Sequence, residues 1–146
     1  EEQLNPEVKK KIPEPATKEQ PSRVLVMDDE DIVCDVASGM LELRDFEVKT
    51  ANCGEQAIKM YQQAIDESHP FQVVIMDLTV PEGIGGVEAV KAILEIDPVA
   101  RVIVSSGYAD DPVMADYTQY GFKGVVAKPY SILELLEAVN RVLEQN

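Results

Sequence analysis

Five short apolar runs alternate with five amphipathic stretches from Arg23 onward, and no other feature constrains the fold of this chain as strongly. The apolar runs are candidate strands, at residues 23–27, 46–50, 71–76, 101–105 and 124–128. The stretches with apolar side chains at helical spacing are candidate helices, at residues 30–43, 54–67, 86–96, 110–120 and 131–145. Strands that alternate with helices need crossover connections, which produce a parallel sheet with helices on both faces.

The apolar pattern inside the strands predicts their order in the sheet. Residues 24–27, 73–76 and 102–104 are continuously apolar, as central strands covered on both faces must be. Residues 46–50 (FEVKT) alternate between apolar and polar, which is typical of an edge strand. We therefore predict a doubly wound, flavodoxin-like (βα)5 fold, an α/β fold whose five parallel strands have the order 2-1-3-4-5.

A composition change near residue 22 predicts the domain boundary. Residues 1–22 contain four prolines, mixed charges and few apolar residues. Such a segment cannot bury enough apolar surface to offset the entropy of ordering it, so we predict a flexible linker. The remaining 23–146 segment has the length of one domain.

The charge and the cysteines exclude several classes of partner and favour one compartment. The formal net charge of −14 disfavours direct contact with nucleic acid or with anionic membrane surfaces. Cys34 and Cys53 have no disulfide or metal-type spacing, which favours a reducing, cytoplasmic setting. No apolar run approaches the ~20 residues of a transmembrane helix, so no membrane insertion is expected.

Polar and charged side chains stand where four of the candidate strands end. Asp28 and Asp29 follow the first strand, Asp77 the third, Ser106 the fourth, and Lys128 closes the fifth. In open parallel sheets, ligands bind outside the carboxyl ends of the strands, so these side chains should meet at one edge. Carboxylates placed together repel each other, and a hard divalent cation with oxygen ligands is the natural counter-charge. The pattern predicts a Mg²⁺ site beside a hydroxyl and an ammonium group.

Each of these residues also has a plain structural interpretation. Asp28 and Asp29 can complement the dipole of the following helix. Asp77 can initiate a turn, Ser106 can be a turn residue before Gly107, and Lys128 can be an exposed charge at a strand end. The convergence of all of them on a single sheet edge is what favours a functional site.

The motifs that carry these residues are VLVMDDE, VVIMDLTVPEGIGG, VIVSSGY and GVVAKPY. In their order and spacing they closely resemble the receiver domains of two-component response regulators, over about residues 23 to 145. The phrases DLTVPEGIGG, SSGYADDPVM and GFKGVVAKPYS look most like receivers attached to hybrid sensor histidine kinases.

The resemblance implies a role for each matching residue. Asp77 would accept a phosphoryl group from the phosphohistidine of a sensor histidine kinase or a histidine phosphotransfer protein. Asp28, Asp29 and Asp77 would hold Mg²⁺ together with the backbone carbonyl of Thr79. Ser106 would bind a phosphoryl oxygen.

The resemblance also assigns the lysine and the output surface. Lys128 would pair first with Asp77 and then with the phosphoryl group, and the Lys128–Pro129 bond would be cis. The phosphoryl group would switch a surface formed by the fourth helix, fifth strand and fifth helix, which is also the candidate homodimer surface. Where the family often carries an aromatic switch residue, this chain has Val125, so the resemblance does not extend to the usual aromatic read-out.

The implied protein is a signalling receiver that catalyses its own phosphorylation and dephosphorylation, rather than an enzyme with a separate substrate. Its output would pass through a partner, or through upstream domains of a longer parent such as a hybrid histidine kinase. Two alternatives stay open. A Mg²⁺-dependent phosphatase of the haloacid dehalogenase type also uses an aspartate nucleophile, although the DDED run lacks that family's D-x-D pattern. A degenerate receiver would act only as a binding module.

Overall fold

A computed structural model describes residues 21–78, 84–108 and 110–145, and its elements alternate as predicted. The strands are β1 (Arg23–Met27), β2 (Glu47–Ala51), β3 (Val73–Asp77), β4 (Val102–Ser106) and β5 (Gly124–Ala127). The α-helices are α1 (Asp31–Glu42), α2 (Gly54–Asp66), α3 (Gly86–Ile96), α4 (Pro112–Ala115) and α5 (Ile132–Leu143). The linker predicted over residues 1–22 falls almost entirely outside the described residues.

The sheet has the predicted topology. Its five strands have the order β2-β1-β3-β4-β5, and every neighbouring pair is parallel. The register aligns Met27 with Met76, and Asp77 with Ser105. The carboxyl ends of the central strands therefore lie at one level, which brings the residues that follow them to the same edge.

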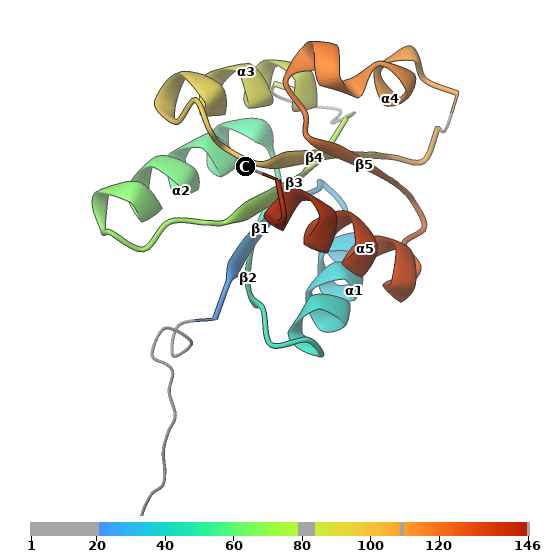
Figure 1. Cartoon of the computed structure of the whole chain (residues 1–146), viewed down its shortest axis with the longest axis horizontal. Coiled ribbons are helices and arrows are strands. Elements are labelled where there is room, and N and C mark those ends of the chain that lie inside the picture. The colour runs from blue at the N-terminus through green and yellow to red at the C-terminus, as the bar shows by residue number, and fades with distance from the viewer. Residues whose placement is uncertain (1–20, 79–83, 109, 146) are drawn as a thin grey trace, which may run out of the picture.

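Helices cover both faces of the sheet, with α1 and α5 on one side and α2, α3 and α4 on the other (Figure 1). Each face of the sheet forms a hydrophobic core with the helices that cover it. Successive side chains of a strand point to opposite faces, so alternate residues of each strand belong to different cores. Leu25 packs with the α2 and α3 side chains, whereas Val24 packs with those of α1 and α5. Both are fully buried, and such a side chain contributes about 1.5–3 kcal/mol. None of the helices among the described residues has the length and apolar character needed to span a bilayer.

The fourth helix differs from the prediction of one continuous helix over residues 110–120. It consists of the four-residue α4 and a separate 3₁₀ turn, Tyr117–Tyr120. Asp111 caps α4, because its side chain accepts a hydrogen bond from the Val113 amide. Asp116 then leaves the helical conformation, and Gly121 ends the 3₁₀ turn at a φ of 99°. Asp, Thr and Tyr are weak helix formers, which explains why the second half does not continue the α-helix.

A glycine fixes the position of α3 against the strand end that carries Asp77. The Gly86 amide donates to the Leu78 carbonyl at 3.2 Å, and a Cβ on Gly86 would lie 2.7 Å from the Asp77 carbonyl oxygen. We expect Gly86→Ala to lower the free energy of unfolding by about 1–3 kcal/mol, because α3 must move away from β3. Urea denaturation followed by far-UV circular dichroism measures this change.

Gly39, an exposed residue in the last turn of α1, provides the matched control. A Cβ at Gly39 would have nothing within 4 Å. Gly39→Ala should therefore raise the free energy of unfolding by about 0.5–1 kcal/mol through helix propensity alone. Equal effects of the two substitutions would mean that close packing at Gly86 does not matter.

Candidate functional site

Three carboxylates meet at the carboxyl edge of the sheet. Asp28 and Asp29 follow β1, and Asp77 is the last residue of β3. One carboxylate oxygen of each lies within 4.8 Å of the others. Asp28 and Asp77 are buried, while Asp29 is exposed. Backbone pairing holds the first of them in place, because the Asp28 amide extends the ladder to the Ala51 carbonyl at 3.0 Å.

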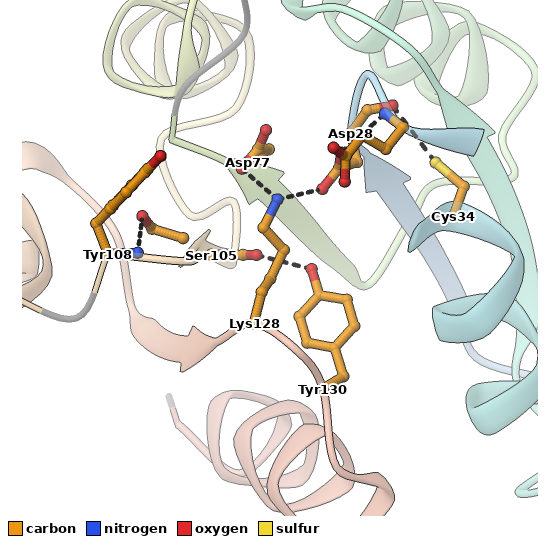
Figure 2. A network of polar contacts seen from close by, with 9 residues as sticks. Asp28, Cys34, Asp77, Ser105, Tyr108, Lys128 and Tyr130 are labelled. Atoms are coloured by element: carbon orange, nitrogen blue, oxygen red, sulfur yellow. Dashed lines mark hydrogen bonds and ion pairs between the residues drawn. The ribbon is translucent and has the colours of Figure 1, made fainter. Parts of the chain in front are cut away.

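A single lysine neutralises part of this negative charge. The Lys128 ammonium lies 2.9 Å from Asp28 Oδ2 and 3.1 Å from Asp77 Oδ1, and Figure 2 shows it between the two carboxylates. The Lys128 amide donates to the Ser106 carbonyl at 2.9 Å, which ties the end of β5 to the end of β4. The Lys128–Pro129 bond is cis, as predicted.

The surroundings shift the protonation of this ion cluster. Burial and the charge of Asp28 raise the pKa of Asp77 to about 6, although Lys128 acts in the opposite direction. Burial alone would lower the pKa of Lys128, but its hydrogen bonds to Asp28 and Asp77 outweigh burial and hold that pKa above its ordinary value. At pH 7, therefore, Asp77 is mostly an anion and Lys128 is a cation.

The cluster faces an open pocket of about 600 Å³. Its lining residues are Asp29, Glu30, Val33, Asp77, Ser106, Gly107, Tyr108, Lys128 and Pro129. The Ser106 hydroxyl oxygen accepts a hydrogen bond from the Tyr108 amide at 3.0 Å, and a hydroxyl that accepts can still donate its own hydrogen to a ligand in the pocket. The pocket thus combines three carboxylates, an ammonium group and a hydroxyl group.

The donor set fits a hard divalent cation. All three grouped ligands are carboxylate oxygens, and such oxygens are preferred by Mg²⁺ and Ca²⁺ over softer metals. One lysine cannot balance three carboxylates, so a cation at this point would relieve their repulsion.

Most of the predicted site residues come together. Asp28, Asp29, Asp77 and Lys128 form the ion cluster, and Ser106 lines the same pocket. Thr79, predicted as a ligand through its carbonyl, lies outside the described residues.

Val125 lies on β5, at the position where the family often carries an aromatic switch residue. Its partly buried side chain packs against the core on the α3 and α4 side and lines a groove of about 290 Å³.

Sequence reasoning missed one contact next to the site. The Ser105 hydroxyl and the Tyr130 hydroxyl lie 2.7 Å apart. Ser105 was predicted to lie at the end of a strand, and nothing in the sequence indicated a role for Ser105 or for Tyr130. The only signal was general, namely that a tyrosine packed into a core needs a partner for its hydroxyl.

Comparisons with known proteins agree with this geometry. The family model of the response regulator receiver domain matches residues 24–140. The chain belongs to the response regulator receiver domain family.

This chain matches nearly the whole length of one curated relative and about half the length of another. A chemotaxis protein CheY of Bacillus subtilis is 34% identical over 122 residues, which are 83% of this chain and 97% of that protein. The response regulator GacA of Pseudomonas aeruginosa is 33% identical over 82% of this chain, which matches only 54% of GacA.

Among solved structures, the CheX–CheY–BeF3–Mg²⁺ complex of Borrelia burgdorferi aligns with a TM-score of 0.78 and 26% identity, over 86% of this chain and 91% of that one. The response regulator TrrA of Thermotoga maritima in complex with Mg²⁺ and BeF aligns with a TM-score of 0.70 and 28% identity, over 83% of this chain and 98% of that one. The closer likeness to receivers of hybrid kinases stays a prediction.

Proposed function

We propose that this domain accepts a phosphoryl group on Asp77 from a phosphohistidine and uses it as a signal. The observation that carries the proposal is the position of Asp77, a buried carboxylate 3.1 Å from an ammonium group and beside two further acids. A carboxylate attacks phosphorus well only when nearby cations offset the charge that builds up. The roles of the individual residues below belong to this proposal.

The three acids are the proposed holders of Mg²⁺, with the carbonyl of Thr79 as a further ligand. Once bound, Mg²⁺ would offset the charge of both the acids and the incoming phosphoryl group. Support comes from the all-oxygen ligand set of this chain and from the two similar solved structures, which are complexes with Mg²⁺.

The protein side chains supply the rest of the transfer step. An Asp77 oxygen forms a bond to phosphorus as the P–N bond of the donor breaks, and the imidazole nitrogen keeps the electron pair of that bond. Lys128 neutralises a phosphoryl oxygen, and the Ser106 hydroxyl donates its hydrogen to another. The open pocket leaves room for the donor side chain.

The proposed partners are a sensor histidine kinase or a histidine phosphotransfer protein. The domain would act as a signalling receiver that catalyses its own phosphorylation and dephosphorylation. The proposed output and homodimer surface is the one formed by α4, β5 and α5, where Val125 and Glu137 line the groove. A hybrid kinase parent and a cytoplasmic location stay predictions.

The test is to incubate the protein with Mg²⁺ and acetyl phosphate, and separately with a phosphorylated histidine kinase, and to follow its intact mass. We expect a labile phosphoryl adduct that borohydride reduction maps to Asp77, because reduction converts an aspartyl phosphate to homoserine. A chelator should slow the labelling by more than about tenfold.

The same experiment separates the alternatives. Steady turnover of phosphate esters such as p-nitrophenyl phosphate would favour a phosphatase of the haloacid dehalogenase type. Failure to take up phosphate from either donor would leave a degenerate receiver that acts by binding alone.

A further inference from the structure

Two hydroxyl groups lie near the ion cluster (Figure 2) and take no part in the proposed transfer step. The Ser105 hydroxyl is 2.7 Å from the Tyr130 hydroxyl. Ser105 is fully buried on β4, and Tyr130 follows Lys128 by two residues in the segment that leads to α5. Figure 2 shows this contact alongside the Lys128 side chain.

The sheet places Ser105 on the same side as the proposed phosphoacceptor. Ser105 is the register partner of Asp77 on the neighbouring strand. Successive side chains of a strand alternate between faces, so Ser105 shares the face of Ile103, in the core formed with α1 and α5. Asp77 shares this face by the same rule, with Ile75. Tyr130 is partly buried and packs against the same core.

The segment that carries the lysine is therefore tied to β4 at two points. The Lys128 amide donates to the Ser106 carbonyl at 2.9 Å, and two residues later the Tyr130 hydroxyl meets Ser105. The Lys128 side chain leaves the backbone between these two hydrogen bonds, and its ammonium group contacts Asp77. Its reach to the carboxylate depends on where this short segment is held.

The hydroxyl of Tyr130 is close enough to the cluster to respond to its charge. Burial first, and then the negative charges of Asp28 and Asp77, raise the pKa of Tyr130 to about 12, while Ser105 and Lys128 act in the opposite direction. Tyr130 therefore stays protonated and can donate or accept in its bond to Ser105.

We infer that the Ser105–Tyr130 hydrogen bond positions Lys128 for phosphoryl transfer, which makes both residues positioning residues of the site. The inference rests on the proposed function of Asp77. A displacement of about 1 Å in a group that takes part in transfer can slow the reaction strongly, so phosphoryl uptake should be slower when the segment that carries Lys128 loses its bond to Ser105. Neither hydroxyl needs to touch the phosphoryl group.

The test compares Tyr130→Phe, Ser105→Ala and the double variant with the wild-type protein. The rate constant of labelling by acetyl phosphate with Mg²⁺ should fall about fivefold in each single variant. The double variant should be no slower than the slower single variant, since both substitutions remove the same bond. Circular dichroism confirms that each variant is folded at the assay temperature.

Tyr61→Phe is the matched control. The Tyr61 hydroxyl is also part of a buried side chain and donates to Asp97 at 2.7 Å, on the α2 and α3 side of the sheet. Its loss should lower stability and leave the labelling rate unchanged. A purely structural role for Ser105 and Tyr130 would give them the same pattern as Tyr61. Labelling rates of Tyr130→Phe and Ser105→Ala within twofold of the wild type would therefore overturn the inference.

A second measurement does not depend on phosphorylation. The ¹⁵N-edited NMR signal of the Lys128 ammonium reports how firmly it is held between Asp28 and Asp77. We expect this signal to shift or broaden in Tyr130→Phe and Ser105→Ala, and not in Tyr61→Phe. If the wild-type protein takes up no phosphoryl group, the proposed function fails, and this signal still decides whether the Ser105–Tyr130 bond positions Lys128: an unchanged signal overturns that positioning, and a changed one supports it.

Discussion

Asp77→Asn is expected to abolish phosphoryl uptake from both acetyl phosphate and a phosphorylated kinase. An asparagine amide lacks the anionic oxygen that attacks phosphorus, so no acyl phosphate can form. The substitution keeps the size of the side chain and leaves the contact of Lys128 with Asp28 at 2.9 Å in place. The intact mass after incubation with Mg²⁺ and donor measures the loss.

The control is Asp66→Asn, which changes an exposed acid at the end of α2, outside the ion cluster. This variant should be labelled as fast as the wild-type protein. If Asp77→Asn is still labelled, and reduction maps the phosphoryl group to Asp28 or Asp29, the assignment of the acceptor is wrong.

The location of the site could be predicted from the sequence because strand ends are a local property. Lys128 and Asp28 are 100 residues apart, yet they contact each other at 2.9 Å. Each was predicted to lie at the carboxyl end of its own strand, and the parallel topology alone brings such ends to one edge. The continuous apolar runs at β1, β3 and β4 likewise indicate that these strands are central in the sheet, as they are.

Contacts that depend on side-chain direction could not be predicted in this way. The resemblance predicted that Lys128 pairs with Asp77. The Lys128 ammonium also contacts Asp28, and this second contact was not predicted because it depends on how far each strand end extends. The Ser105–Tyr130 bond depends on the path of the chain after Lys128, and no periodicity reports that path.

The fourth helix shows a different limit of sequence reasoning. Residues 110–120 have apolar positions compatible with a helix, but the local preferences of Asp116 and Gly121 divide the segment. A short segment that packs through few buried side chains, such as Met114, follows its local preferences rather than the pattern.

Asp77→Asn is also expected to stabilise the domain at pH 7 when divalent cations are absent. The pKa of Asp77 is raised to about 6, whereas an unfolded aspartate titrates near 3.9. The folded protein therefore binds the proton more tightly than the unfolded chain. Its stability should fall as the pH rises from about 4 to about 6, and the ionised carboxylate should cost about 3 kcal/mol above that window.

Asparagine carries no charge at any of these pH values, so the variant should lack this part of the pH dependence. Urea denaturation in a chelating buffer should therefore give a difference between variant and wild type that is large at pH 7 and small near pH 4. Added Mg²⁺ should reduce the difference at pH 7, because a ligand that binds only the folded wild-type site stabilises it by mass action. Stability curves of the two proteins that run parallel from pH 4 to pH 7 would show that burial and Asp28 do not destabilise the charged form of Asp77. In that case no bound cation would be needed to offset repulsion among the three carboxylates.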